Sequence, residues 1–187
     1  GNATNGAESE FVVRVPACPP ALRIDVQARF TVRRNWPYTN VQFFDVFPFR
    51  GVLPEDWWYD EVLWVAADGR VKWMRTRERT YGGDTDLATL TGPVFVALHS
   101  SDRGNMVMLV HDFKPALPVQ YVICGNYIDF HMAVRFSGPD DKPAPPRPGE
   151  AVSMAYQLAL WGDGKTTRDR LIELGRASLN KGSLALE

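Results

Sequence analysis

Apolar and polar residues alternate with a period of two along much of the chain, a pattern typical of β-strands. In the segment 22–33 the even-numbered positions are mostly apolar and the odd-numbered positions are polar. The segment 150–161 repeats this alternation, and its apolar side carries Val152, Met154, Tyr156, Leu158 and Leu160. Both segments are therefore predicted to be strands with one buried face and one solvated face.

Weaker forms of the same pattern predict strands over the rest of the chain. They cover 11–15, 41–47, 57–67, 70–80, 94–99, 106–112, 119–136 and 183–187, and 82–92 is expected to be a loop. The span 119–136 is too long for one strand, and Gly125 with Asn126 marks a bulge or a bend in it. The segment 101–105 predicts a hairpin connection, and the proline-rich stretch 139–149 predicts a stiff, extended one.

A single segment, 166–177, has the features of a helix. Thr166 is expected to cap it, and Asp169 supplies the acidic partner of a start that resembles a capping box. The preceding sequence, 162–167, is rich in glycine but lacks the spacing of a phosphate-binding loop, so it predicts no nucleotide site.

About ten strands and one short helix near the C-terminus predict an all-β fold, an antiparallel β-sandwich. Helices between the strands, which a βαβ fold requires, are missing from the pattern. The length of 187 residues fits one domain. We therefore expect a disordered N-terminal segment over 1–9 and a single β-sandwich domain over 10–187.

The strongest local signal is Asp68-Gly69, which separates two alternating segments and predicts a two-residue type I′ hairpin turn. Such a turn pairs residues whose numbers sum to 137, so Trp64 is expected to lie opposite Trp73 on one face. The same face would carry Trp58, Asp60, Arg75, Arg77 and Arg79, with Trp57 and Tyr81 nearby.

These seven residues form the predicted ligand-binding site. Aromatic rings can stack on the apolar faces of sugars, and arginine side chains bind carboxylates or sulfates through two parallel hydrogen bonds. The combination predicts a polysaccharide or oligosaccharide ligand, and an acidic one in particular. In the alternative interpretation the tryptophans pack within the fold, and the arginines reach solvent and pair with Asp60. A one-residue bulge would split the arginines between both faces.

Other aromatic residues lie in predicted loops. Trp36 and Tyr38 are further candidates for ligand platforms, and the alternative is that they seal one end of the sandwich.

Charge and composition exclude several classes of partner. The net charge of −1 argues against a nucleic-acid partner, which would require an excess of basic residues. The apolar runs are shorter than the roughly 20 residues that span a bilayer, so the chain is not expected to cross a membrane. Cys18 and Cys124 could form one disulfide, and spacing alone leaves this open.

The polar start Gly1-Asn2-Ala3-Thr4-Asn5-Gly6 is interpreted as a mature N-terminus that follows a removed signal peptide. On this interpretation the protein is secreted or periplasmic. The alternative is a domain cut from a larger chain.

Catalytic signals are sparse. His99, His111 and His131 are the only histidines, and no metal-binding motif surrounds them, so neither a metal nor a cofactor is predicted. Asp129 and His131 lie two residues apart, which places them on the same face of a strand, where they could form an acid–base pair.

Two segments resemble a known superfamily. The span 26–47 contains a strand pattern, then Asn35-Trp36-Pro37-Tyr38-Thr39-Asn40, then a second strand pattern, and Arg147-Pro148-Gly149-Glu150 later leads into a strand that ends near Trp161. This order resembles the supersandwich domains of the galactose-mutarotase-like superfamily, which occur in carbohydrate-processing enzymes, often as non-catalytic domains.

The polar N-terminus, the predicted hairpin site and this resemblance together lead to the prediction of an exported carbohydrate-binding module without catalysis. One alternative is a mutarotase-like or lyase-like enzyme that acts on sugars through Asp129, His131 or His111. Another is a structural or assembly protein whose exposed aromatic residues contact a partner chain. The oligomeric state is left open.

Overall fold

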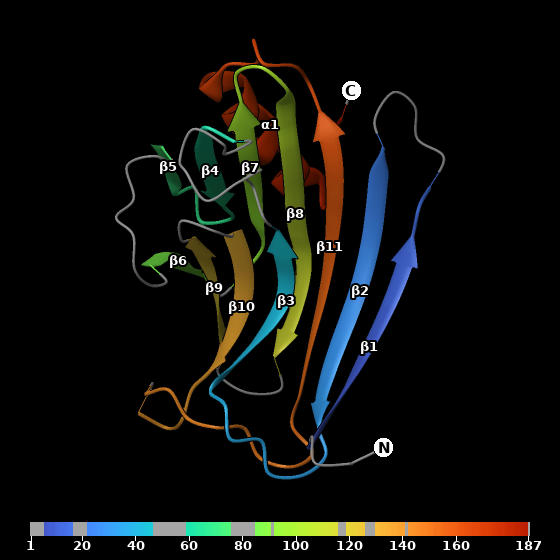
Figure 1. The fold of residues 1–187 in the computed structure, drawn as a ribbon, viewed down its shortest axis with the longest axis vertical. Coiled ribbons are helices and arrows are strands. Elements are labelled where there is room, and N and C mark those ends of the chain that lie inside the picture. Colours follow the sequence, from blue (N-terminus) through green and yellow to red (C-terminus); the bar gives the residue numbers. More distant parts are fainter. Residues whose placement is uncertain are drawn as a thin grey trace.

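The computed structural model describes residues 6–16, 22–46, 59–75, 85–90, 92–115, 119–125, 130–140 and 142–186, which form two antiparallel sheets and one helix (Figure 1). The larger sheet has seven strands, in the order β1 (Ala7–Arg14), β2 (Arg23–Val32), β11 (Ala151–Trp161), β8 (Gly104–Pro115), β7 (Val94–Ser100), β4 (Glu61–Ala66) and β5 (Val71–Arg75). The smaller sheet has the order β3 (Asn40–Val46), β10 (Phe130–Phe136), β9 (Val119–Gly125) and β6 (Thr85–Leu90). The prediction of an antiparallel all-β fold with one helix near the C-terminus is confirmed.

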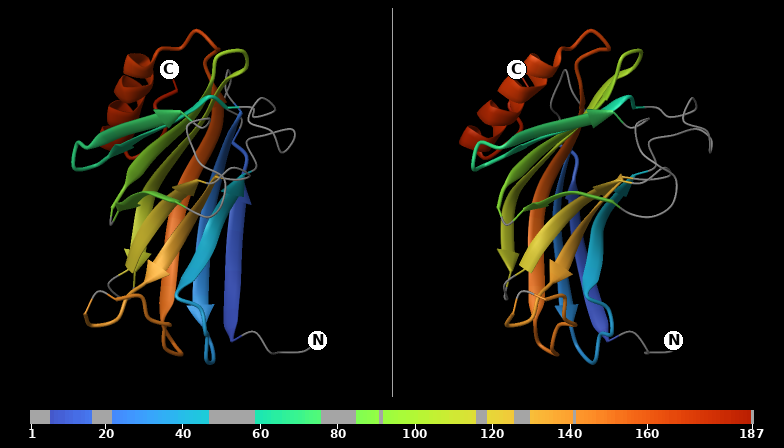
Figure 2. Two further views of the ribbon diagram at one scale, coloured as in Figure 1. Left: turned by 60° about the vertical axis from the view of Figure 1, so that its left-hand side comes forward. Right: turned by 90° about the vertical axis from the view of Figure 1, so that its left-hand side faces the viewer.

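The seven-stranded sheet buries apolar side chains on both of its faces. On the face that we call inner, they cluster with Val134 and Phe136 of β10. On the opposite, outer face they cluster with Leu171 and Leu174 of α1 (Arg168–Lys181). Figure 2 shows the helix and the smaller sheet on opposite sides of the larger one, so the arrangement is sandwich-like with a helix on the outside.

The alternation in β2 and β11 determines the inner face, as predicted, but the other face of β11 is not solvated, because Gln157 and Ala159 are buried on the side of α1. Val26, Ala28, Phe30 and Val32 of β2 are buried on the inner face. So are Val152, Met154 and Tyr156 of β11, whereas Leu160 is 58% exposed. The span 119–136 forms two strands rather than one, as predicted, since β9 ends at Gly125 and pairs antiparallel with β10, which begins at Phe130.

The N-cap of the helix lies one residue later than predicted, and the helix, expected over 166–177, runs from Arg168 to Lys181. Thr167 is its N-cap and accepts a hydrogen bond from the backbone N–H of Arg170, whereas the Thr166 hydroxyl accepts one from the backbone N–H of Asp163. The helix ends at Gly182, whose φ of 68° is the left-handed conformation that commonly terminates helices. This helix is too short and too polar to cross a bilayer, and the described residues contain no helix that could.

Three predictions of local structure are wrong. Residues 7–9 belong to β1 rather than to a disordered segment, because they pair with the end of β2. Residues 85–90 form β6 rather than a loop.

The third correction concerns the end of the chain, where 183–186 form no strand. The backbone N–H of Leu184 donates to the Gln157 side chain (2.6 Å), and that of Ala185 donates to the Ser178 hydroxyl (3.1 Å). Side-chain acceptors thus replace a strand partner, while Leu184 and Leu186 join the cluster under α1.

Candidate functional site

The β4–β5 hairpin, which carries the predicted site, has a register one residue different from the prediction. Its pairs sum to 136, so Leu63 lies opposite Trp73, and Trp64 lies opposite Lys72. The loop has three residues rather than two, and Gly69 in it has a φ of 88°. A three-residue loop that ends in a left-handed glycine is the next most common hairpin connection after the two-residue turn.

The change of register separates the two tryptophans. Trp64 is 6% exposed and belongs to the inner cluster. Trp73 is 40% exposed and projects from the outer face with Arg75 and Glu61, because these residues alternate with the inner ones. The expected pair of tryptophans on one face therefore does not form.

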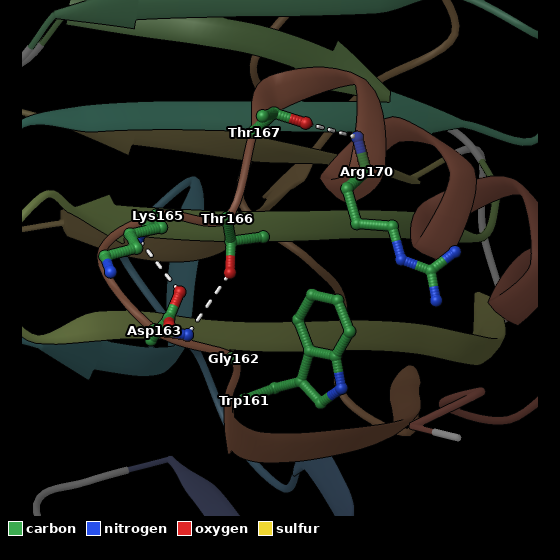
Figure 3. A pocket seen from close by; sticks show the side chains of 7 residues that line it. All are labelled: Trp161, Gly162, Asp163, Lys165, Thr166, Thr167 and Arg170. Carbon is green, nitrogen blue, oxygen red and sulfur yellow. Dashed lines mark hydrogen bonds between the residues drawn. The ribbon is translucent and has the colours of Figure 1, made fainter.

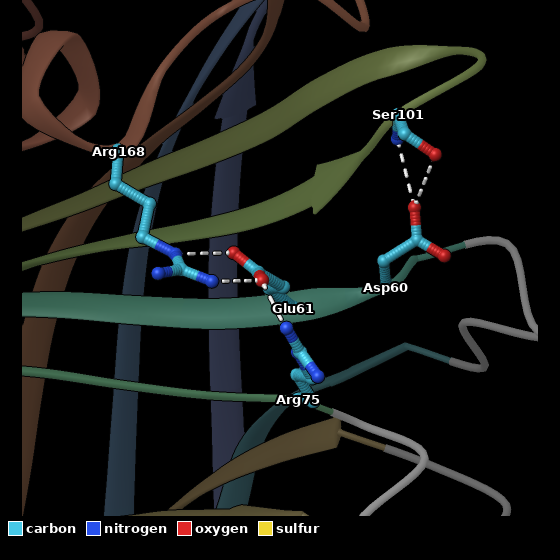
Figure 4. A network of polar contacts seen from close by, with 5 residues as sticks. All are labelled: Asp60, Glu61, Arg75, Ser101 and Arg168. Carbon is cyan, nitrogen blue, oxygen red and sulfur yellow. Dashed lines mark hydrogen bonds and ion pairs between the residues drawn. The ribbon is translucent and has the colours of Figure 1, made fainter.

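Only two of the seven predicted site residues lie among the described residues. Arg75 pairs in register with Glu61 and approaches its carboxylate, with Nε 3.9 Å from Oε1. The carboxylate of Asp60 accepts hydrogen bonds from the backbone N–H and the hydroxyl of Ser101, both at 2.8 Å, in the turn between β7 and β8 (Figure 4). Outside the described residues lie Trp57, Trp58, Arg77, Arg79 and Tyr81.

The loop aromatics Trp36 and Tyr38 follow β2. The Trp36 ring meets Phe30 edge-on at 5.1 Å and Tyr38 at 5.3 Å, and it packs against the inner cluster. This contact matches the interpretation of Trp36 as a residue that seals one end of the fold.

Glu61 is the centre of a charged network on the outer face. Arg168, at the start of α1, donates from Nε to Oε2 at 2.8 Å and from its Nη2 to Oε1 (Figure 4). The same guanidinium lies 3.3 Å from the centroid of the Trp73 ring. Arg168 thus joins the helix to β4 and β5 through a bidentate ion pair and a cation–π contact.

The surroundings of Glu61 lower the pKa of its carboxyl group. The hydrogen bonds from Arg168 are the largest cause, partly opposed by burial, and the charges of Arg168, His99 and Arg75 act in the same direction as the hydrogen bonds. The folded protein therefore holds this carboxylate in its charged form at a lower pH than the unfolded chain does.

Replacing Glu61 with glutamine is expected to lower the free energy of unfolding by about 1 kcal/mol at pH 7, since an amide loses the ion pairs with Arg168 and Arg75. The carboxylate contributes its full stability above the unfolded pKa of about 4.3, and the contribution is lost as the pH falls through the lower folded pKa. The difference between wild type and E61Q should therefore shrink below about pH 4.3. Urea titrations from pH 7 to pH 3 measure this, and a difference that does not change with pH would contradict it.

The second feature of the outer face is an open pocket of about 500 Å³ at the junction of β11 and α1 (Figure 3). Trp161, the last residue of β11, forms one wall, and the Arg170 guanidinium lies 6.0 Å from the centroid of its ring. The remaining lining residues come from the connecting loop and the helix cap: Gly162, Asp163, Lys165, Thr166 and Thr167.

A buried asparagine holds this loop in place. The side chain of Asn105, in β8, is 3% exposed and donates from Nδ2 to the carbonyl oxygens of Trp161 (2.9 Å) and Asp163 (3.5 Å). Its Oδ1 lies 2.7 Å from Nδ1 of His99. Because this amide oxygen can only accept, His99 must carry its proton on Nδ1.

Close packing against the β7–β8 turn also positions the loop. A Cβ at Gly164 would overlap the carbonyl oxygen of Ser101, so only glycine allows this approach of the two backbones. The Asp163 carboxylate accepts from the backbone N–H of Lys165 at 2.9 Å, which orients the acid toward the loop.

The pocket combines an aromatic wall, two cations and one carboxylate. Arg170 also contacts Glu173, with Nη1 3.3 Å from Oε2, and Lys165 is exposed. The volume of the pocket is within the usual range for small-ligand sites, although the pocket is open to solvent. Sequence reasoning missed this site because it tested 162–167 only against a phosphate-binding loop. The available signal was a tryptophan at the end of a strand followed at once by Asp163 and Lys165.

Of the alternative catalytic residues, Asp129 lies outside the described residues, whereas His131 and His111 belong to different sheets, in β10 and β8. The third histidine, His99, contacts Asn105 on the outer face. His111 lies at the irregularity in the pairing of β8 with β11. The described residues contain no group of three or more histidine, cysteine or acidic side chains that could hold a metal ion. The possible disulfide between Cys18 and Cys124 cannot be located, because Cys18 lies outside the described residues.

Comparisons of this chain with family models, with curated proteins and with solved structures found no match. Its function is therefore inferred from the geometry of its own residues.

Proposed function

We propose that this protein is a non-catalytic carbohydrate-binding domain, and that the pocket beside Trp161 receives one sugar ring of an oligosaccharide or polysaccharide. The observation that carries the proposal is that Trp161, Arg170, Lys165 and Asp163 line one open pocket. The site is thus different from the hairpin face that the sequence pointed to, while the class of ligand is the same.

Each of these groups suits a part of a sugar. The Trp161 indole offers a flat apolar surface to the C–H face of a pyranose ring. The Asp163 carboxylate can accept hydrogen bonds from hydroxyl groups, since a carboxylate is an acceptor only. Arg170 and Lys165 add donors, and the guanidinium can bind a carboxylate or a sulfate through two parallel hydrogen bonds.

The charge of the pocket favours an acidic sugar over a neutral one. Two cationic side chains line it against one carboxylate, and Glu173, which pairs with Arg170, is not itself a lining residue. The N-terminal end of α1 adds a partial positive charge on the same side, because Thr167, its N-cap, is itself a lining residue. The open shape suits a residue within a long chain, which must enter and leave through the sides of the pocket.

Replacing Trp161 with alanine is expected to weaken binding to a polyuronate at least about tenfold, because a central aromatic contact is usually worth more than 1.4 kcal/mol. A glycan array first finds the ligand, and affinity gels that contain a polyuronate or a neutral glucan then measure the retardation of each variant. Arg170→Gln should reduce binding to the polyuronate more than binding to the neutral glucan.

Trp73→Ala is the matched control, since the Trp73 ring also lies beside an arginine of α1 but outside the pocket. Arg77→Ala tests the hairpin face. Normal binding by the Trp161 variant together with loss in the Arg77 variant would move the site to the hairpin. An array without any bound glycan would overturn the proposal.

A further inference from the structure

The strand β1 forms one edge of the seven-stranded sheet and exposes apolar side chains to solvent. Phe11 is 54% exposed, Val12 47% and Val13 59%. Among the described strands, only β2 pairs with β1. Long apolar edge strands are usually covered or interrupted by charges in monomeric proteins, because their free backbone groups can pair with another chain.

The backbone geometry shows which groups of β1 face the open edge. The N–H of Arg33 donates to the carbonyl of Gly6, while the N–H of Val32 donates to Glu150 on the other side of β2. The N–H and C=O groups of successive residues point to opposite sides of a strand. Because Gly6 bonds toward β2, the even-numbered residues of β1 do so as well. The N–H and C=O groups of Phe11 and Val13 therefore point away from the sheet.

The sequence of this edge is complementary to itself. Glu10-Phe11-Val12-Val13-Arg14 consists of an acid, three apolar residues and a base. In an antiparallel pair of two such strands centred on Val12, Glu10 lies opposite Arg14 of the other copy at both ends. Phe11 lies opposite Val13 of the other copy, so every apolar residue meets an apolar one.

The charges at the two ends are available for such a pairing. Both Glu10 and Arg14 are exposed, and no ion pair found within the described part of the chain uses either of them. Arg14 lies opposite Asp25 of β2, but the Asp25 carboxylate is occupied by both Nε and Nη2 of Arg23, at 2.9 and 3.1 Å.

We propose that two copies of this chain associate through their β1 strands, in antiparallel register about Val12, so that the two seven-stranded sheets join into one. The interface is isologous, as expected for a two-fold dimer. Opposite charges across it fix the register and favour a second copy over a strand of unrelated sequence. This proposal does not depend on carbohydrate binding, because the Trp161 pocket lies elsewhere on the sheet.

Sedimentation equilibrium of the whole chain tests the proposal through charge reversal. Glu10→Arg places like charges opposite each other at both ends, and so does Arg14→Glu, so each should raise the dimer dissociation constant at least about tenfold. The double variant E10R/R14E restores opposite charges and should regain the wild-type constant. Arg176→Glu, an exposed change on α1 with the same change of charge as Arg14→Glu, should have no effect.

A cross-link tests the register. Two residues at the centre of a non-hydrogen-bonded pair have Cα atoms about 4.5 Å apart, which allows a disulfide. Val12→Cys should therefore form a covalent dimer under mild oxidation, identified by mass spectrometry as a peptide linked through position 12. Arg14→Cys should not, because residue 14 faces residue 10 of the other copy.

A wild-type chain that remains monomeric at 100 µM would overturn the proposal. So would a dimer that the double variant fails to restore while its thermal unfolding is unchanged. A dimer that resists both single reversals, with no cross-link at position 12, would place the interface on another surface.

Discussion

Replacing Asn105 with alanine is expected to lower the free energy of unfolding by about 3 kcal/mol, because the side chain makes three buried hydrogen bonds worth about 1 kcal/mol each. Asn105 bonds to the carbonyl oxygens of Trp161 and Asp163 and to His99. Alanine cannot form these hydrogen bonds, and water has little access to the buried site that Asn105 occupies. Urea unfolding at pH 7 measures the loss.

The same variant should also weaken the binding of any ligand at the Trp161 pocket, since Asn105 holds the first residues of the pocket loop. Asn180→Ala, an exposed asparagine on α1, is the control and should change stability by less than about 0.5 kcal/mol. If the two variants were equally stable, ordered water would have to satisfy the exposed carbonyl groups, and the loop would not depend on Asn105.

Replacing Gly175 with alanine is expected to destabilise the protein by about 1–2 kcal/mol, although alanine is a better helix former. Helix propensity alone predicts a gain of about 1 kcal/mol. However, a Cβ at this position would lie 2.7 Å from Cδ1 of Phe95 and 3.0 Å from Cγ2 of Val65. Phe95 is fully buried, so its ring cannot turn aside, and overpacking of this kind costs about 1–3 kcal/mol or more.

A double-mutant cycle separates the two effects. Phe95→Ala removes both ring atoms, Cγ and Cδ1, that a Cβ at position 175 would meet, so the G175A/F95A variant should be more stable than the sum of the two single changes predicts. Thermal and urea unfolding of all four proteins give the coupling free energy. A gain of stability in the single G175A variant would show that α1 can move away from the sheet at little cost.

The site and the fold differ in how far the sequence could predict them. The inner faces of β2 and β11 follow from local alternation, because a side chain's face depends only on its position along the strand. The hairpin at Asp68-Gly69 was located correctly, but its register depended on whether the loop holds two or three residues. One residue changed the neighbours of Trp73 from Trp64 to Leu63 and Arg168.

The pocket beside Trp161 could not be assembled from spacing alone. Asn105 lies 56 residues before Trp161 in the chain, yet its side chain positions the loop that follows that tryptophan. Glu61 and Arg168 are separated by 107 residues and form the ion pair that joins α1 to the sheet. Such contacts depend on strand order, which places β11 between β2 and β8.

The sequence by itself therefore determined that this protein is an antiparallel all-β fold with one C-terminal helix, and which apolar residues of β2 and β11 face inward. Those properties are local, since they depend on the order of apolar and polar residues along one strand. Only the tertiary structure decided that 10–14 lies at a free edge, that Trp64 and Trp73 point to opposite faces, and that Arg170 and Trp161 share a pocket. The physical reason is that these outcomes depend on which distant segments pack together, and packing is determined by the whole core rather than by any one segment of it.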